Sequence, residues 1–573
     1  MPASEPVGLP DTMPALTRRL VAARMARWDE PLAVWYRPTM RSTFPNPFGP
    51  QDMRLAAETI LAAIDARATI GLFGDYDADG ATSVGVMARY LTDLGITTHI
   101  RIPDRFTEGY GPNIKGLSEL VEKDCSLIVI LDSGSTAFEV MDEADRLGIK
   151  AVIIDHHACA ADRLPKALAF VNPNRPDDKS GLGYLCAAGL SFLTCCAIHK
   201  LMRDDKSRTA PLPDLMGYLD IAALGTVADI VPLRGFNRTI VACGLTVMNQ
   251  RPNIGMQALM AVADIKDRKP GSRDLGFALG PRVNAGGRIG DSSIGARLMA
   301  SQDPAHAATL AAELDQLNVE RKKIENEVRE DALAKAMALP AERRLILVSG
   351  HYHEGVVGIT AGRIKETLLK PTIVLSETEH GTLKGSGRSM PGFDLGHAII
   401  AAREKGLLIA GGGHGMAAGL TVAPEQVEAL VAFLEGEIAG SEFARTGPIL
   451  GYDLETDPAG LTVEIIEGLT ELEPFGEGNP VPRFLLSGLV VDKVDVVKEI
   501  HLRVTLRAGR SSFKAMLFSS VGTAFAAAIE ARHGKTIDVI ASCSINEWQG
   551  RKSLELDIID ARASAGAAGR VAA

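Results

Sequence analysis

No stretch of this sequence is long and apolar enough to form a membrane-spanning helix. The longest candidate, Cys186 to Ile198, carries small and polar residues and falls short of the roughly 18 apolar residues that a bilayer requires. The seven cysteines form no CxxC pair, and the N-terminus lacks the layout of a signal peptide, with Glu5, Asp11 and several prolines before its first arginine. These absences exclude an integral membrane protein and predict a protein of the reducing cytoplasm.

The sequence also lacks an excess of basic residues. Lysine and arginine together number 61 against 71 acidic residues, which gives a formal net charge of −10. This balance argues against a nucleic-acid binder that relies on bulk electrostatics. Metal-binding aspartates account for part of the acidic excess, however, and a basic groove can exist on an acidic protein. Nucleic acid therefore stays open as a ligand class.

The length of 573 residues predicts three or four domains. A Pro-rich extension before Arg54 is expected to wrap over the first domain. From Thr69, short apolar runs alternate with helical stretches, a pattern typical of parallel strands that are buried on both faces. We therefore predict an α/β fold that begins with a parallel sheet.

The second half of the chain changes character twice. The segment from Asp303 to Leu339 is rich in helix formers without internal glycine or proline, and it predicts a long bridging helix. A second α/β unit follows, and short strands separated by turn residues then predict a small β-barrel. The predicted boundaries are 1–53 for the extension, 54–300 for the first domain, 301–340 for the helix, 341–445 for the second domain, 446–562 for the barrel and 563–573 for a disordered tail.

Three alternating aspartates stand in the stretch "GDYDADG", at Asp75, Asp77 and Asp79. An EF-hand calcium loop starts in this way, but its twelfth position should be a bidentate glutamate and is Val86 in this chain. A calcium loop is therefore not predicted. In an extended segment, alternate residues project to the same side.

More carboxylates and two histidines follow other predicted strands. Asp132 ends "SLIVILD", Asp155 is followed by His156 and His157, and Asp229 lies within "LGTVADIVPL". Ligands of an open parallel sheet bind beyond the carboxyl ends of the strands, so these groups are expected to hold two divalent cations about 3.5–4 Å apart for phosphoryl chemistry. A single aspartate at such a position is more often a turn former or a helix N-cap.

Four motifs, "GDYDADG", "LDSG", "IIDHH" and "GTVADIVPL", resemble in this order the motifs of the DHH phosphoesterase superfamily. Further segments, such as "PRVNAGGRIGD", "GSGRS", "GGGHGMAAG" and "LEPFGEGNPVPRF", are similar to the RecJ family of bacterial exonucleases within it. The resemblance covers about Arg54 to Arg562. It implies a DHH parallel-sheet domain joined by a long helix to a DHHA1 α/β domain, and a C-terminal OB-fold barrel.

The resemblance also implies roles for individual residues. The metal ligands would be Asp75, Asp77, Asp79, Asp132, His156 and Asp229. The catalytic set would be Asp77, Asp79, Asp132, His157 at the scissile phosphate, and Asp155, which would orient the histidines. The 5′-phosphate would be held by Arg105, Ser386 and Arg388. DNA would be contacted by Tyr76, Arg282, Asn284, Arg288, His414, Arg503 and Lys514.

Some of these assignments have structural alternatives. Tyr76 could pack under the site instead of stacking on a base, Arg282 or Arg288 could form a surface ion pair, and "GSGRS" alone is a common flexible turn. In the barrel, further charge would come from Arg507, Arg510, Arg551 and Lys552, and aromatic rings from Phe513 and Trp548.

By this resemblance, the chain would be a processive 5′-to-3′ exonuclease that uses two Mn²⁺ or Mg²⁺ ions to release 5′-mononucleotides from single-stranded DNA in recombination and repair. A single-stranded-DNA-binding protein and a RecQ-type helicase would be its protein partners. Two other hypotheses remain open: a phosphodiesterase of cyclic dinucleotides or short oligonucleotides, and a noncatalytic nucleic-acid-binding scaffold.

Overall fold

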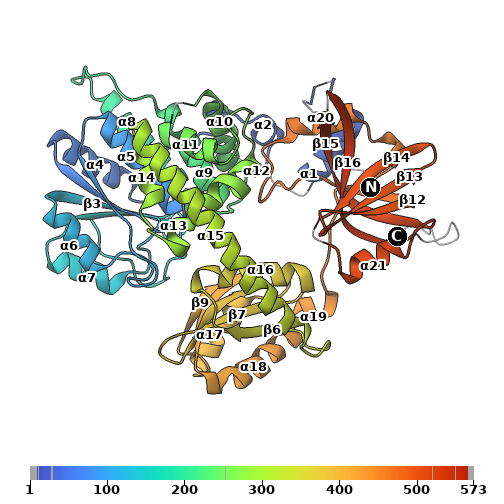
Figure 1. Ribbon diagram of the computed structural model, residues 1–573. Coiled ribbons are helices and arrows are strands. Elements are labelled where there is room, and N and C mark those ends of the chain that lie inside the picture. The colour runs from blue at the N-terminus through green and yellow to red at the C-terminus, as the bar shows by residue number, and fades with distance from the viewer. Residues whose placement is uncertain are drawn as a thin grey trace.

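The computed structural model describes residues 9–10, 12–26, 30–251, 253–518, 520–548 and 550–564. Figure 1 shows three bodies: a large α/β domain, a smaller α/β domain below it and a β-barrel beside both. The predicted tail beyond residue 564 and the side chain of Trp548 lie outside the described residues. No helix among the described residues has the length and apolar character needed to span a membrane.

The first domain contains a five-stranded, wholly parallel sheet, as predicted. Its strand order is β2-β1-β3-β4-β5. The strands are β1 (Thr69–Phe73), β2 (Thr98–Arg101), β3 (Cys125–Leu131), β4 (Ala151–Ile154) and β5 (Ala169–Val171).

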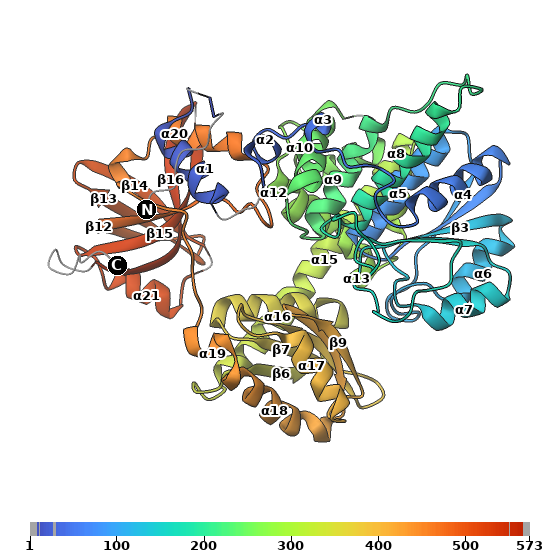
Figure 2. The same cartoon turned by 180° about the vertical axis from the view of Figure 1, so that it is seen from behind.

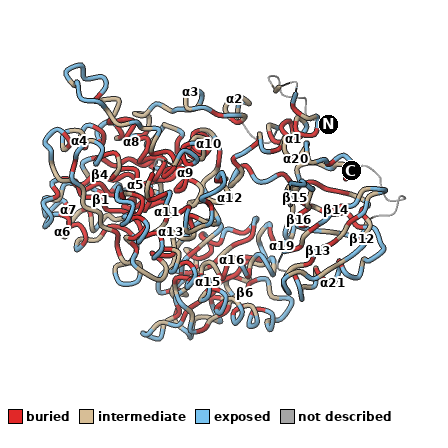
Figure 3. Tube along the Cα trace, turned by 45° about the horizontal axis from the view of Figure 1, so that its top comes forward, coloured by how far each residue is buried: buried red, intermediate tan, exposed pale blue. Residues whose placement is uncertain are grey.

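Alternate side chains of β1 enter different apolar clusters. Ile70 and Leu72 pack among helices α4 (Met53–Asp65), α5 (Ala78–Asp93) and α8 (Ala187–Asp204). Phe73 packs on the opposite face, with α6 (Ile114–Glu122) and α7 (Phe138–Arg146). Burial on both faces explains why the strands are continuous apolar runs, and Figure 3 shows this burial concentrated around β1, β4, α5 and α8.

Helices complete the first domain and lead into the second. They are α9 (Leu219–Ala228), α10 (Gly235–Gln250), α11 (Ile254–Val262), α12 (Ser272–Asp274), α13 (Gly280–Ile289) and α14 (Ile294–Ala300). The predicted bridging helix is α15 (Pro304–Met337), which is 34 residues long. Its Leu310 and Leu314 pack in the first domain, and its Ala332 and Ala336 pack in the second.

The second domain is a mixed sheet covered by helices. Its strand order is β6-β7-β8-β10-β9, with only β6 and β7 parallel. The strands are β6 (Ile346–Gly350), β7 (Thr372–Glu377), β8 (Leu383–Arg388), β9 (Ala410–His414) and β10 (Ala417–Val422), and the helices are α16 (Glu354–Leu368), α17 (Leu395–Glu404), α18 (Val427–Gly440) and α19 (Glu442–Thr446).

The C-terminal domain is the predicted barrel. It closes through pairing of β12 with β15. Its elements are β11 (Leu454–Thr456), α20 (Val463–Gly468), β12 (Arg483–Val497), β13 (His501–Ala508), β14 (Ser511–Leu517), α21 (Ala524–Glu530), β15 (Thr536–Trp548) and β16 (Arg551–Ala563).

The N-terminal extension differs from the expectation that it wraps over the first domain. Helix α1 (Ala15–Met25) packs instead into the barrel core through Leu16 and Leu20. Arg24 also donates to the Asp453 carboxylate at 3.1 Å. Described residues from α2 (Leu32–Trp35) onward, including α3 (Met40–Thr43), contact the first domain, and Figure 2 shows α1 beside the barrel strands.

One buried arginine joins the first domain to the segment that precedes the barrel. Arg238, on α10, is fully buried and donates to the backbone carbonyls of Trp35 (2.6 Å), Leu472 (2.8 Å), Glu473 (3.1 Å) and Pro474 (3.0 Å). Burial lowers the pKa of this guanidinium to about 10. We call this set of bonds the Arg238 clamp.

Candidate active site

The "GDYDADG" motif turns the chain from β1 into α5. Asp77 caps α5, because its side chain accepts the N–H groups of Asp79 (2.9 Å) and Gly80 (3.0 Å). A side chain at position 80 would come within 2.5 Å of the Asp75 carbonyl oxygen, so the turn requires glycine there. The N-cap interpretation therefore holds for Asp77, and it leaves Asp75 and Asp79 to be explained.

Asp79 is fully buried and faces the start of α8. Its two carboxylate oxygens accept the N–H groups of Ala187 (2.7 Å) and Ala188 (2.9 Å). A carboxylate is favourable at a helix N-terminus, where backbone donors lack partners within the helix. Val86 is buried in α5, which agrees with the prediction that this segment is not a calcium loop.

The other predicted ligands converge on the same edge of the sheet. Asp132 follows β3 with a left-handed backbone (φ 62), Asp155 and the two histidines follow β4, and Asp229 caps the C-terminus of α9. Asp229 thus comes from a helix end and not from a strand. His156 lies at the centre of the cluster.

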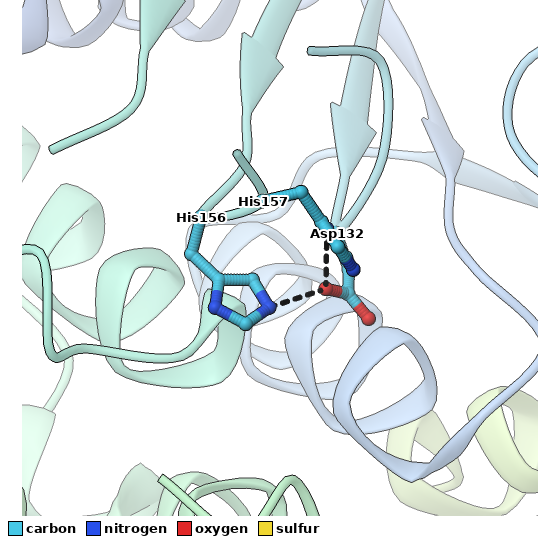
Figure 4. Close-up of side chains that lie close together, drawn as sticks. All are labelled: Asp132, His156 and His157. Atoms are coloured by element: carbon cyan, nitrogen blue, oxygen red, sulfur yellow. Dashed lines mark ion pairs between the residues drawn. The ribbon is translucent and has the colours of Figure 1, made fainter. Parts of the chain in front are cut away.

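Figure 4 shows both histidines directed at one oxygen of Asp132. The His156 Nε2 atom lies 3.3 Å from Asp132 Oδ1, and 3.7 Å from a carboxylate oxygen of Asp79 and of Asp229. His157 Nδ1 lies 3.9 Å from Asp132 Oδ1. Ligand atoms close enough to hold an ion form three groups: Asp132 with His156 and His157; Asp79 with His156 and Asp229; and Asp75 with Asp77 and Asp132. Asp132 belongs to two groups, as a bridging ligand would.

Three buried polar atoms of this cluster have no hydrogen-bond partner: Oδ1 of Asp75, Oδ1 of Asp132 and Nε2 of His156. An unsatisfied buried polar group costs about 1–3 kcal/mol, so such groups need an explanation. Burial and repulsion from neighbouring carboxylates raise the pKa of Asp75, Asp132 and Asp229 well above the ordinary range. Divalent cations would satisfy these atoms and neutralise the repulsion, so the residues fit a two-ion site.

His157 and Asp155 form a separate pair at the edge of this cluster. The Nδ1 atom of His157 lies 2.8 Å from Asp155 Oδ1, and the other oxygen of Asp155 accepts the hydroxyl of Ser135 at 2.6 Å. Burial opposes the protonation of His157, but the hydrogen bond and charge of Asp155 outweigh it and raise the histidine pKa to about 9. Burial likewise opposes ionisation of Asp155, yet the bond to His157 keeps the pKa of Asp155 below its ordinary value.

The pair predicts a pH-dependent contribution to stability in the metal-free protein. Because the folded-state pKa of His157 is raised from 6.5 to about 9, its contribution should be complete below about pH 6.5 and lost as pH rises through about 9. The loss of melting temperature caused by His157→Gln should therefore be largest near pH 6 and should disappear at about pH 10. His351→Gln, at an exposed histidine, is the control. If the loss of melting temperature in His157→Gln grew with pH, a protonated His157 paired with Asp155 would be contradicted.

A second feature lies between the first two domains. A cavity of about 520 Å³ is lined by four cationic side chains, Arg105, Arg288, Lys384 and Arg388, and by one carboxylate, Glu354. Arg388 donates to the Ser386 hydroxyl at 2.7 Å. Burial, together with repulsion from Arg105, lowers the pKa of Arg388, and the same causes lower that of Arg288 to about 10. Arginines that repel one another in a cavity favour a bound anion.

Comparisons with known proteins agree with this architecture. The model of the DHH family N-terminal domain matches residues 69–226, the DHHA1 domain matches 343–440 and the RecJ OB domain matches 452–560. The single-stranded-DNA-specific exonuclease RecJ of Escherichia coli K12 is 32% identical over 579 residues, with 97% of each chain covered. The chain belongs to the RecJ family. Both the sequence resemblance and the predicted fold class are confirmed.

Other RecJ proteins give the same result. The Bacillus subtilis exonuclease RecJ is 34% identical over 92% of this chain, and the chain spans 65% of that relative's length. The crystal structure of Thermus thermophilus RecJ in complex with Mn²⁺ matches with a TM-score of 0.77 and 28% identity, over 95% of this chain and 76% of the other.

The structure gives two of the predicted DNA-contacting residues internal partners. Arg282 forms an ion pair with Asp315 of α15 at 2.8 Å, which is the alternative stated for it. The side-chain oxygen of Asn284 accepts the Ala78 N–H at 2.8 Å and so holds the first turn of α5. Arg288, by contrast, lines the cationic cavity and donates to the Gly355 carbonyl at 3.0 Å.

Tyr76 is partly buried beside the cavity. The Arg105 guanidinium lies 5.1 Å from its ring centroid and the Tyr110 ring packs edge-on at 6.4 Å. The packing alternative for Tyr76 thus has a structural basis, and base stacking stays a prediction.

The remaining DNA contacts also stay predictions, with one correction. His414 is exposed at the end of β9, and Arg503 and Lys514 are exposed on the barrel. Phe513 is only 6% exposed and packs in the barrel core, so the expectation that its ring stacks on a base is wrong.

Two site residues were not predicted. The Tyr110 hydroxyl lies 3.1 Å from His157 Nδ1, and Lys384 lines the cationic cavity. The glycines on both sides of Tyr110 in "EGYGP" were an available signal for a tight turn at a site. Lys384 stands two residues before Ser386 on β8, so strand periodicity places it on the same face.

Proposed function

We propose that this chain is a metal-dependent exonuclease that degrades single-stranded DNA processively from its 5′ end and releases 5′-mononucleotides. The observation that carries the proposal is the position of the carboxylate and histidine cluster beside a cationic interdomain cavity. Arg288 connects the two features, because it lines the cavity and lies near enough to Asp77 for that carboxylate to act on its pKa. The cluster can hold the ions, and the cavity can hold the strand end.

The cofactor would be two Mn²⁺ or Mg²⁺ ions, which suit ligation by carboxylate oxygens and imidazole. Crystal structures of Thermus RecJ contain either metal. Bound ions would activate water and stabilise charge on the phosphate oxygens. The residues Asp75, Asp77, Asp79, Asp132, His156 and Asp229 would hold them, with Asp132 shared.

Other side chains of the protein would contact the scissile phosphate and bind the 5′ end of the strand. His157, kept protonated by Asp155, would donate a hydrogen bond to the scissile phosphate, and Tyr110 would help fix the orientation of the imidazole. Arg388, Ser386 and Arg105 would hold the terminal 5′-phosphate one nucleotide away. Because that anchor binds only a 5′ end, it would set the direction of degradation.

The substrate is single-stranded DNA. A role in recombination and repair, contacts with a single-stranded-DNA-binding protein and a RecQ-type helicase, and a cytoplasmic location complete the proposal. Pull-down of the whole chain with each purified partner tests those contacts.

The proposed polarity predicts a defined effect of replacing Arg388. A 3′-labelled single strand should shorten from its 5′ end with Mn²⁺ and stay intact with EDTA, and blunt duplex should stay intact. Hydrogen bonds to charged groups contribute about 1.5–3 kcal/mol, so Arg388→Met should reduce the preference for 5′-phosphate over 5′-hydroxyl by roughly 10- to 100-fold. The measurement is kcat/KM for both strands.

Arg344→Met is the matched control, since Arg344 is an exposed arginine of the same domain outside the cavity. An unchanged preference in Arg388→Met would remove the cavity from the proposal. A parent protein that binds the strand without cutting it under either metal would contradict the exonuclease itself. Cleavage of dinucleotides alone would favour the short-substrate phosphodiesterase.

A further inference from the structure

The cationic cavity is larger and more strongly charged than a terminal monophosphate requires. Its four cations and one carboxylate leave a formal excess of three positive charges. A phosphate monoester carries about −1.5 to −2 near neutral pH, so about one positive charge or more stays uncompensated. Its volume of about 520 Å³ lies within the range of sites for whole small molecules.

The cationic and hydroxyl groups of β8 are arranged in a row. Lys384, Ser386 and Arg388 alternate along the strand and line the cavity, whereas the intervening Gly387 faces Ile373 and Leu395 in the core. At about 3.3 Å per residue, Lys384 and Arg388 lie about 13 Å apart along the strand. A row of this length can contact several linked phosphate groups in succession.

The neighbouring strands leave space above this row. Gly419 of β10 pairs with Ser386, and Gly412 of β9 pairs with Gly419. A side-chain carbon built on Gly412 or Gly419 would meet no atom within 4 Å. Both glycines line the cavity, so the floor beside Ser386 is open and free of side chains.

The two ends of the row differ in their surroundings. Arg388 lies at the end near Arg105. The Arg105 guanidinium covers the ring of Tyr76, which stands in the sequence between the predicted metal ligands Asp75 and Asp77. Lys384 lies at the other end, where its Nζ atom pairs with Glu354 at 2.9 Å. This pair is partly exposed, with 52% of the lysine and 33% of the glutamate side chain accessible, so its energy is small and an anion can compete for the lysine.

From this arrangement we infer that the cavity accepts a 5′-polyphosphate, in which the first phosphate binds Ser386 and Arg388 and the following phosphates extend to Lys384. The inference rests on the proposed exonuclease function and specifies its substrate: strands with a 5′-triphosphate as well as those with a 5′-monophosphate. Free nucleoside triphosphates carry the same group and are the other source of this chemistry.

The first nucleotide released from a triphosphorylated strand would show directly whether the cavity accepts that end. Hydrolysis of the first phosphodiester breaks the bond between phosphorus and the 3′-oxygen of the terminal nucleotide, which leaves with a 3′-hydroxyl and its own 5′ group. Water supplies the oxygen of the new 5′-phosphate on the shortened strand. A triphosphorylated strand should therefore release one nucleoside triphosphate and afterwards only monophosphates.

The test compares one oligonucleotide with a 5′-hydroxyl, a 5′-monophosphate or a 5′-triphosphate, in the full chain with Mn²⁺. We expect KM for the triphosphate strand to be no higher than for the monophosphate strand, with one nucleoside triphosphate released per strand. In Lys384→Met, KM for the triphosphate strand should rise about tenfold relative to KM for the monophosphate strand. Lys405→Met, at an exposed lysine of the same domain outside the cavity, should leave this ratio unchanged.

The outcomes separate the two proposals. If the monophosphate strand is degraded and the triphosphate strand is not, the polyphosphate site is wrong and the exonuclease stands. If free dATP competes with the monophosphate strand but the triphosphate strand is not cut, the cavity serves free nucleotides and the inference about strand ends is overturned. If no strand is cut, the proposed function itself fails. An equal KM ratio in the parent and in Lys384→Met, with unchanged melting temperatures, would also overturn the role of Lys384.

Discussion

Replacing Asp132 by asparagine is expected to reduce the rate of strand cleavage at least about a thousandfold, which corresponds to roughly 4 kcal/mol. Asp132 belongs to two of the three potential ion-binding groups, so its loss would disturb both ions. The same substitution should raise the melting temperature of the metal-free protein. It removes a buried charge whose Oδ1 atom has no partner and which neighbouring carboxylates repel.

Asp132→Asn should thus lower the cleavage rate and raise the melting temperature of the metal-free protein. This combination distinguishes a metal site from a structural cluster, in which the substitution would lower both. We expect Mn²⁺ to raise the melting temperature of the parent protein and to have a much smaller effect on Asp132→Asn. Asp142→Asn, at a surface carboxylate that pairs with Arg163, is the control and should behave like the parent. If Asp132→Asn lowered the stability of the metal-free protein and left the response to Mn²⁺ unchanged, the cluster would be a structural network and not a metal site.

Replacing Arg238 by methionine is expected to cost about 3 kcal/mol or more of stability. The clamp supplies donors to four backbone carbonyls from one buried guanidinium. Asn479 also donates to the carbonyls of Leu472 and Pro474, so the loss falls mainly on the bonds to Trp35 and Glu473 and on the packing of the guanidinium over the Trp35 ring. Arg238→Lys should recover only part of the loss, because an ammonium group cannot reproduce the planar fork of donors.

Thermal unfolding and limited proteolysis of the whole chain measure this effect. We expect the segment around Leu472 to Pro474 to become the first site of cleavage in Arg238→Met, since the clamp holds three of its carbonyls. Arg203→Met, at an exposed position on α8, is the matched control. Unchanged unfolding in Arg238→Met would mean that water or a neighbouring side chain satisfies the carbonyls equally well.

Features set by local pattern were predictable from the sequence. The strands of the first sheet are apolar runs because both faces are covered, and parallel strands bring their carboxyl ends to one edge. Asp132, Asp155 and His156 could therefore be grouped from the sequence alone. Asp229 was harder to recognise as part of this edge, because it caps the C-terminal end of α9 and a residue at a helix end has no periodic pattern.

Features that depend on distant packing were not predictable. In β14, alternation shows that Lys514 and Phe513 face opposite sides, but not that the inner side of the barrel is fully enclosed, so Phe513 was expected at the surface. Asn284 belongs to a motif that suggests a ligand contact, and only the packing of α13 against α5 shows that it binds the Ala78 N–H. Helix α1 gives no local sign that its partner is the barrel.

The position of α1 has a consequence for the order in which the protein is completed during translation. Arg24 and its partner Asp453 are 429 residues apart in the chain. At about 5–20 residues per second, a ribosome needs roughly 20–90 s to synthesise the residues between them, and the barrel strands emerge later still. Throughout this interval Leu16, Leu20 and Val21 have no barrel core to enter. Helix α1 is thus synthesised long before the barrel on which it packs, and a nascent chain that already has a folded catalytic domain still exposes the apolar side chains of α1 to binding by a chaperone.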